Sequence, residues 1–136
     1  MSQIKGHLKS KARGLSIRYA SPEAFQMLEE RNGNASATLD DTVIDVYAYG
    51  IILWELIERK IPWEGKNYGE IRNSVMNGVR PDISKKNEGS DDKLVFTMMD
   101  NMRKAWSHES SQRPTFDQMS QDLQLTYYLQ HKTILE

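Results

Sequence analysis

The fold is decided by residues 43–57, which read VIDVYAYGIILWELI. Charged side chains occur in this run only at Asp45 and Glu55. A run of this length favours a helix, although its β-branched residues leave a buried strand as the rival interpretation. Because the run is apolar nearly all round rather than along one stripe, we expect a central helix that the rest of the fold surrounds on several sides.

Helix-ending signals lie on both sides of this run. Residues 40–42, Asp-Asp-Thr, are good N-terminal caps immediately before Val43. Arg59 and Lys60 suit the negative C-terminal end of a helix, and Pro62 prevents its continuation. The sequence therefore predicts a helix with defined ends.

Two shorter helices are predicted next to the central one. Pro22 suits a first helical turn, and Asn32-Gly33 breaks the pattern that follows it. Asn67, with Glu70 three residues later, resembles a capping box for a helix through about Met76. Asn77-Gly78 would end that helix.

Two more helices are predicted in the C-terminal half. Ser90 and Asp91 could open one of them, and residues 94–106 repeat apolar side chains at helical spacing. The methionines in this stretch indicate core packing rather than a binding surface. Thr115, boxed with Gln118, opens the last helix. We expect a mainly α fold of about five helices, one of them central and buried.

The N-terminal stretch has a different character from the rest. Residues 1–20 carry Lys and Arg but no acidic residue and few large apolar ones, which predicts a flexible basic arm. A mitochondrial transit peptide is an alternative interpretation of this composition. We divide the chain into an arm at 1–20, a helical domain at 21–130 and a tail at 131–136.

Bulk composition excludes several classes of protein. With 18 Lys plus Arg against 19 Asp plus Glu, the net charge of -1 gives no general reason to expect nucleic acid as a partner. The absence of cysteine excludes disulfides and thiolate metal sites, and it is compatible with the cytoplasm or nucleus. No apolar run reaches the roughly 18 to 20 residues of a membrane span, so we expect no membrane partner.

The order of four motifs resembles the second half of a protein kinase catalytic domain. Residues 18–23, Arg-Tyr-Ala-Ser-Pro-Glu, resemble the end of an activation segment, with Ser21 in place of the usual alanine. Residues 45–56 resemble the long central helix of the large lobe, with Tyr47 where tryptophan is commonest. This resemblance identifies the arm at 1–20 as an activation-segment remnant.

The other two motifs follow at the matching distance. Residues 78–81, Gly-Val-Arg-Pro, are similar to the segment after the next kinase helix. Trp106 lies seven residues before residues 113–116, Arg-Pro-Thr-Phe, as in tyrosine kinases and their serine/threonine-specific relatives. Ser16 falls where serine/threonine kinases usually carry threonine, which favours the tyrosine-kinase-like serine/threonine group over a tyrosine kinase.

The resemblance implies roles for a few residues. Glu23 and Arg113 would form a structural ion pair, since an arginine fork binds a carboxylate through two parallel hydrogen bonds. Without the resemblance, two solvated surface charges would be the simpler interpretation. Asp45 would anchor the central helix by accepting backbone amides from a catalytic loop, and otherwise it is only an acid near a helix start.

Substrate and modification roles are weaker implications of the same resemblance. Ser16 and Tyr19 would line the groove for a protein substrate, and Ser10 or Ser16 could accept phosphate, although most loop serines have neither role. Basic residues between Lys5 and Arg13 could attract acidic substrates or pair with a phosphate, but such runs are usually only solvated.

The groups that perform phosphoryl transfer do not occur in this sequence. It contains no Gly-x-Gly-x-x-Gly, no lysine in a Val-Ala-x-Lys context, and no His-Arg-Asp or Asp-Phe-Gly triplet. We therefore assign no catalytic, cofactor-binding or metal-binding residue, and expect ATP and magnesium to serve only a complete parent kinase. His7, His108 and His131 have no metal-ligand spacing and receive no function.

Two interpretations of function stay open at this point. The chain is either a fragment of a serine/threonine kinase domain that is inactive alone, or a pseudokinase-like module that binds proteins. In the first case its partners would be a protein substrate and the missing N-terminal half of the kinase. Because a central apolar helix without its neighbours leaves apolar surface in water, we also expect marginal stability and self-association.

Overall fold

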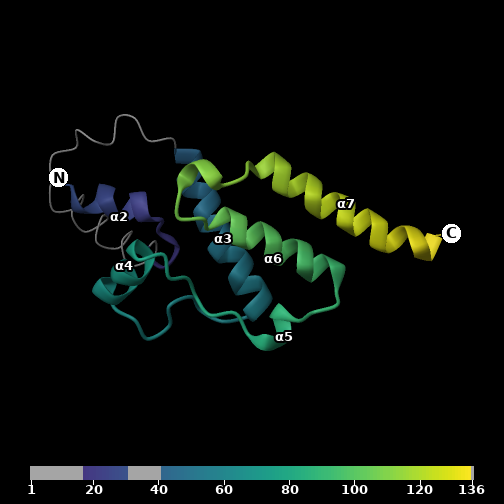
Figure 1. The fold of residues 1–136 in the computed structure, drawn as a ribbon, viewed down its shortest axis with the longest axis horizontal. Coiled ribbons are helices and arrows are strands. Elements are labelled where there is room, and N and C mark those ends of the chain that lie inside the picture. The colour runs from purple at the N-terminus through teal and green to yellow at the C-terminus, as the bar shows by residue number, and fades with distance from the viewer. Residues whose placement is uncertain (1–16, 31–40, 136) are drawn as a thin grey trace, which may run out of the picture.

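The structure, a computed structural model, describes residues 17–30 and 41–135. Within these ranges it contains six α-helices and no strand, which confirms the mainly α fold (Figure 1). The helices are α2 (Pro22–Glu29), α3 (Asp41–Glu58), α4 (Tyr68–Met76), α5 (Lys85–Glu88), α6 (Lys93–Ala105) and α7 (Phe116–Leu135). Two 3-10 turns, η1 (Ile17–Tyr19) and η3 (Ser110–Gln112), complete the described elements.

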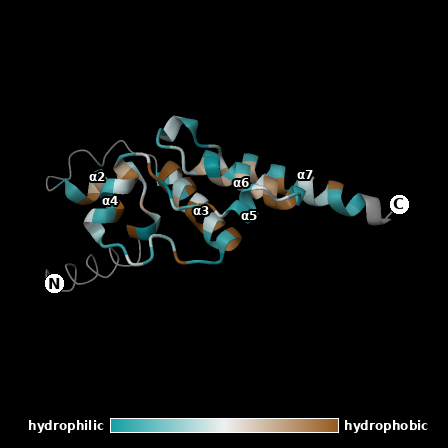
Figure 2. Cartoon of the chain, turned by 60° about the horizontal axis from the view of Figure 1, so that its bottom comes forward, coloured by the Kyte–Doolittle hydropathy of each residue, from teal (hydrophilic) through white to brown (hydrophobic). Residues whose placement is uncertain are grey.

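Helix α3 is the centre of the fold, and the rival strand interpretation is wrong. Helix α6 packs along it and α7 packs on α6 (Figure 1), and η1 also contacts α3. Figure 2 shows hydrophobic residues along α3. The structure does not surround α3 completely, because Ile52 is 42% exposed and Leu56 is 59% exposed.

The core is built around the inner face of α3. Its buried apolar side chains come from α2, α3, α4 and α6 and from the two residues that follow η1 and α6. The largest members are Phe25, Tyr47, Ile51, Leu53, Trp54, Ile71, Val75, Met99, Met102 and Trp106. Met99 and Met102 lie in the core as the sequence predicted. A smaller cluster of Val46, Ala105 and Met119 joins α3 and α6 to α7.

The helix starts differ from the sequence prediction at two places. Helix α3 begins at Asp41, so Asp41 and Thr42 belong to its first turn and are not caps. Helix α6 is capped by Asp92, not by Ser90 or Asp91, because the Asp92 carboxylate accepts hydrogen bonds from the backbone N–H groups of residues 94 and 95. The Ser90 hydroxyl instead accepts from the Asp92 N–H at 3.2 Å.

Helix α4 begins and ends as its sequence predicts. The Asn67 side chain accepts from the Glu70 N–H at 2.9 Å, while the Glu70 carboxylate pairs with Lys66. At the other end Gly78 adopts a φ of 79°, which only glycine adopts without strain. The Val79 N–H then bonds to the Ser74 carbonyl at 2.8 Å, as in a Schellman motif.

The short helix α5 is an addition to the predicted five. Ser84 caps it, and the Glu58 carboxylate at the end of α3 accepts from the Ser84 N–H at 2.8 Å and from the Asn87 amide at 3.0 Å. One polar turn has no apolar periodicity, so apolar spacing does not predict this helix.

Gly50 sets the approach of α3 to α6 and provides a test of the packing. A Cβ at Gly50 would lie 3.1 Å from the Trp106 backbone nitrogen and 3.2 Å from the Met102 carbonyl oxygen. We expect Gly50→Ala to lower the free energy of unfolding by about 1–3 kcal/mol, because the α6 backbone cannot move aside cheaply. Urea denaturation followed by circular dichroism measures the change.

Gly69 in α4 is the matched control for Gly50. The nearest atom to a Cβ there is the Asn67 Oδ1 at 3.6 Å, which is an ordinary contact. Gly69→Ala should therefore raise stability, by up to about 1 kcal/mol, through helix propensity alone. Equal effects of the two substitutions would contradict a close contact between α3 and α6.

Candidate functional site

The structure brings Glu23 and Arg113 together from positions ninety residues apart in the chain. Ser21 caps α2 by accepting from the Ala24 N–H at 3.2 Å, with Pro22 as the first helical residue. This start places Glu23 in the first turn of α2. Arg113 follows η3 in an extended conformation, with φ of -78° and ψ of 137°, as the residue before a proline favours.

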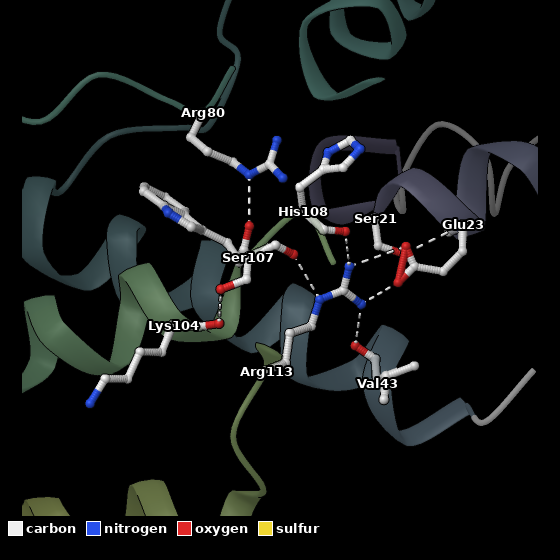
Figure 3. A network of polar contacts seen from close by, with 10 residues as sticks. Ser21, Glu23, Val43, Arg80, Lys104, Ser107, His108 and Arg113 are labelled. Atoms are coloured by element: carbon white, nitrogen blue, oxygen red, sulfur yellow. Dashed lines mark hydrogen bonds and ion pairs between the residues drawn. The ribbon is translucent and has the colours of Figure 1, made fainter. Parts of the chain in front are cut away.

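Every nitrogen of the Arg113 guanidinium is used (Figure 3). Nη1 and Nη2 bind the two carboxylate oxygens of Glu23, the second at 3.1 Å. Nη1 also donates to the Val43 carbonyl at 2.9 Å, Nε to the Ser107 carbonyl at 2.9 Å, and Nη2 to the His108 carbonyl at 3.3 Å. The arginine side chain is 0% exposed and that of Glu23 is 12% exposed.

This pair joins three parts of the fold. Glu23 lies in the first turn of α2, Val43 in the first turn of α3, and Ser107 and His108 in the loop after α6. Because the arginine is buried, removing its carboxylate would leave a charge in a site that water does not reach. The contact therefore holds the start of α2 in a fixed place against α3 and the loop after α6.

Tyr47 contacts two guanidinium groups. The guanidinium carbon of Arg80 lies 5.0 Å from the centre of its ring and that of Arg113 lies 5.2 Å from it, so both form cation–π contacts. The ring is 0% exposed, and the Tyr47 hydroxyl has no hydrogen-bond partner in the part of the chain that the structure describes. Burial raises the pKa of Tyr47 to about 12, although the two positive charges oppose this shift.

Arg80 is a site residue to which sequence reasoning gave no role. Its Nε donates to the Trp106 carbonyl at 2.8 Å, and its Nη1 donates to the Val79 and Val75 carbonyls at 2.9 and 3.2 Å. Burial lowers the pKa of Arg80. One signal could have found it, because Arg80-Pro81 and Arg113-Pro114 are two Arg-Pro pairs and both arginines contact Tyr47.

Tyr19 lies in η1 next to α3. A hydrogen bond to the Glu55 carboxylate, with partial burial and the charge of Glu55, raises the pKa of Tyr19 to about 12. Its neighbour Arg18 donates from Nη1 to the Pro62 carbonyl at 2.7 Å. These contacts hold η1 against α3 and the loop behind it. A role of Tyr19 in substrate binding stays a prediction.

Asp45 lies on the uncovered side of α3. Its side chain is exposed, and its carboxylate makes no hydrogen bond to another described residue. Ile52 and Leu56 follow seven and eleven residues later, so helical geometry places the three on one face. We call Asp45, Ile52 and Leu56 the α3 stripe. An anchor role for Asp45 stays a prediction.

The remaining candidate residues divide into two groups. Ser10, Ser16, His7 and the basic run from Lys5 to Arg13 lie outside the described residues. His108 contributes its backbone carbonyl to Arg113, and the His131 ring stacks on Tyr127 with centroids 4.0 Å apart.

The described residues offer neither a cluster of metal ligands nor a helix suited to a membrane. Within 17–30 and 41–135, no three or more His, Cys, Asp or Glu side chains are placed to hold a metal ion. None of the helices described combines the length and apolar character that crossing a membrane requires.

Removing Arg113 should destabilise the protein far more than removing an exposed arginine. We expect Arg113→Ala to lower the free energy of unfolding by about 3–5 kcal/mol, since Glu23 loses its buried partner. The control is Arg72→Ala. Arg72 also binds a glutamate, Glu29, but both side chains of this pair are more than a third exposed, at 35% and 37%. That change should cost under about 1 kcal/mol. Similar losses in urea denaturation would refute the importance of the buried pair.

Tyr47 should make stability fall at alkaline pH. Its folded pKa of about 12 lies above the ordinary value of 10.0, so the folded state keeps the proton that the unfolded state loses in this range. The resulting stabilisation is present below pH 10.0 and is lost as the pH rises towards 12, by about 1.4 kcal/mol per pH unit.

The matched variant for this effect is Tyr47→Phe. It should remove the Tyr47 share of the alkaline slope, leaving that of Tyr19, and it should leave stability at neutral pH equal or slightly higher because a buried hydroxyl without a partner is removed. Denaturation at several pH values from neutral to alkaline measures both. A variant that loses stability at neutral pH would show that the hydroxyl has a partner.

Comparison with known proteins gives a consistent group of relatives. A family model described as protein tyrosine and serine/threonine kinase matches residues 2–123. A probable LIM domain-containing serine/threonine-protein kinase of Dictyostelium discoideum is 34% identical over 105 residues, which cover 77% of this chain and 14% of that protein. Receptor-interacting serine/threonine-protein kinase 2 of Bos taurus is 32% identical over 109 residues, which cover 79% of this chain and 19% of that protein.

A plant kinase is similar to this chain to about the same degree. The serine/threonine-protein kinase STY46 of Arabidopsis thaliana is 33% identical over 85 residues, covering 62% of this chain and 14% of that protein. The chain thus spans less than a fifth of each of these three relatives.

Proposed function

Because the chain belongs to the family of protein tyrosine and serine/threonine kinases, we propose that it forms the large-lobe scaffold of a kinase that transfers the ATP γ-phosphate to protein serine or threonine. The chain is part of a serine/threonine kinase domain, as its relatives are serine/threonine kinases. The observation that carries the proposal is the buried Glu23–Arg113 pair, which fixes the start of α2 against the first turn of α3 and the loop after α6.

A fixed activation segment is what phosphoryl transfer requires of this part of a kinase. Catalysis of this reaction consists mainly of positioning the nucleotide, the metal and the substrate hydroxyl. Residues 17–23 are held at three points, by Arg18 on the Pro62 carbonyl, by Tyr19 on Glu55 and by Glu23 on Arg113. A substrate that docks on this segment would therefore meet a rigid surface.

The α3 stripe supports a partner for the proposed scaffold. Ile52 and Leu56 place apolar area in water, and Asp45 is a hydrogen-bond acceptor on the same face. Covering each large apolar side chain contributes roughly 1.5–3 kcal/mol, and a carboxylate at the edge can accept backbone N–H groups. We propose that this stripe receives the other half of the kinase domain.

The residues of this chain do not fit ATP and magnesium themselves. No phosphate-binding glycine motif or kinase metal-ligand triplet occurs in the sequence, and the described ranges hold no group of three or more candidate metal ligands. ATP and magnesium would supply the transferred phosphate in the complete enzyme. We therefore derive no nucleotide-binding step from this chain and propose that it has no kinase activity alone.

The finer assignments rest on the family relation. Ser16 and Tyr19 would contact the protein substrate, and Ser10 or Ser16 would accept a regulatory phosphate near the basic residues of the arm. We propose the cytoplasm or nucleus as its compartment, with neither nucleic acid nor membrane as a partner.

A protein-binding module without catalysis is the second candidate function. The same α3 stripe favours it, since an exposed apolar face can receive an unrelated protein. The gene that encodes the chain distinguishes the two candidate functions. A frame upstream that encodes the missing kinase motifs supports the scaffold of an active kinase, and its absence supports the binding module.

Reconstitution tests the scaffold function directly. The chain alone should give no heat on titration with magnesium and ATP and no phosphate transfer to a generic serine/threonine substrate. Coexpression with the upstream segment that carries the missing motifs should produce turnover. Leu56→Asp should lower this turnover at least tenfold, because it places a charge in the apolar stripe at a cost of about 1.4 kcal/mol or more.

The matched control for this experiment is Ile61→Asp. Ile61 is 53% exposed, close to the 59% of Leu56, but it lies in the loop after α3. Its turnover should stay within about twofold of the unchanged protein. Saturable nucleotide binding by the chain alone, or equal losses in the two variants, would overturn the scaffold proposal.

A further inference from the structure

Helix α7 has an inner face that α6 fixes in place. The two helices run antiparallel, since Thr97 near the start of α6 meets Thr126 and Asn101 farther along α6 meets Met119. The Thr97 and Thr126 hydroxyls are 2.8 Å apart, and the Gln130 amide donates to the Asp92 carboxylate at 3.1 Å. These contacts extend past residue 123, where the match to the kinase family ends.

The opposite face of α7 carries apolar side chains in water. Leu125 and Tyr128 are each 59% exposed and Leu129 is 54% exposed. Helical geometry places Asp122 and Lys132, both exposed, on the same side at either end of these residues. We call Asp122, Leu125, Tyr128, Leu129 and Lys132 the α7 stripe.

A neighbouring side chain of α6 widens this surface. Phe96 is 68% exposed, the highest value among the large exposed apolar residues described. It lines a groove of about 340 Å³ together with Asp122, Leu125 and Thr126 of α7. A phenylalanine left in water beside an apolar stripe marks an interaction surface rather than a scattered apolar residue.

The α7 stripe is complementary in charge and apolar character to a second, antiparallel copy of itself. Asp122 lies five residues before Tyr127 and Lys132 five residues after it, while Leu125 lies two before and Leu129 two after. An antiparallel pair of α7 helices centred on Tyr127 therefore places acid opposite base at both ends and leucine opposite leucine between them. A two-fold axis requires this kind of match, in which one patch binds its own copy.

We propose that α7 binds α7 of a second copy of this chain in this antiparallel register. Asp122 of each copy then faces Lys132 of the other, Leu125 faces Leu129, and the second α7 lies in the groove beside Phe96. Helices pack at axial distances of about 8–10 Å, which brings side chains of this size into contact. The result is a four-helix arrangement of two α6 and two α7 helices.

Charge favours a second copy over an unrelated partner. Two acids, Asp100 and Asp122, line the groove with one base, Lys104, which pairs with Asp100 at 2.8 Å. A partner helix must then present an apolar pair and a positive charge one helical turn away. The α7 stripe itself carries this combination in Leu125, Leu129 and Lys132.

Sedimentation equilibrium of the full chain tests the proposal. At concentrations up to about 100 μM the chain should show a concentration-dependent mass that approaches twice that of one copy. Asp122→Lys and Lys132→Asp should each raise the dimer dissociation constant about tenfold at low salt, since each places like charges at both ends of the pair. The double variant restores opposite charges and should return the constant to within about threefold.

A matched pair of leucine substitutions separates this surface from the α3 stripe. Leu125→Ser should raise the dissociation constant at least tenfold, whereas Leu56→Ser, at the same 59% exposure, should leave it unchanged. Both leucines are exposed, so circular dichroism should show both variants folded. A monomer throughout the concentration range, failure of the double charge variant to recover, or an equal effect of Leu56→Ser would overturn the proposal.

Discussion

The burial of one guanidinium group, that of Arg113, is the constraint on which the rest of the structure depends. A buried charge is tolerated only with a counter-ion and with acceptors for its remaining N–H groups. Glu23 supplies the first, and the carbonyls of Val43, Ser107 and His108 supply the second. These acceptors come from separate elements, so satisfying one side chain fixes the start of α2, the first turn of α3 and the loop after α6 together.

Tyr47 connects this site to the hydrophobic core. Its ring belongs to the main apolar cluster and at the same time contacts the guanidinium groups of Arg80 and Arg113. Two cations near each other repel, and the negative face of an aromatic ring attracts a cation that contacts it. The ring thus contacts both the ionic site and the apolar core, while its hydroxyl makes no hydrogen bond within the described structure. This explains why the position takes an aromatic residue of large size.

The two stripes, both on described helices, have different consequences. The α3 stripe lies on the central helix, and in the proposed scaffold function its occupant, the other half of the kinase domain, completes the catalytic site. The α7 stripe lies on another helix, partly on residues beyond the family match. A protein that binds the α7 stripe therefore leaves the α3 stripe uncovered. Self-association and assembly of a complete kinase domain are therefore compatible in the same protein.

The sequence by itself determined the helical fold, the central position of α3, the capping box at Thr115 and Gln118 and the ends of α4, because apolar periodicity and capping are local properties. It proposed Glu23 and Arg113 as a pair only through the order of family motifs. Tertiary structure alone decided which side of the nearly all-apolar α3 stays exposed, that Asp92 rather than Ser90 or Asp91 caps α6, and that Arg80 shares the ring of Tyr47. These features arise from contacts between residues distant in the chain, and local pattern carries no information about which distant partner is present.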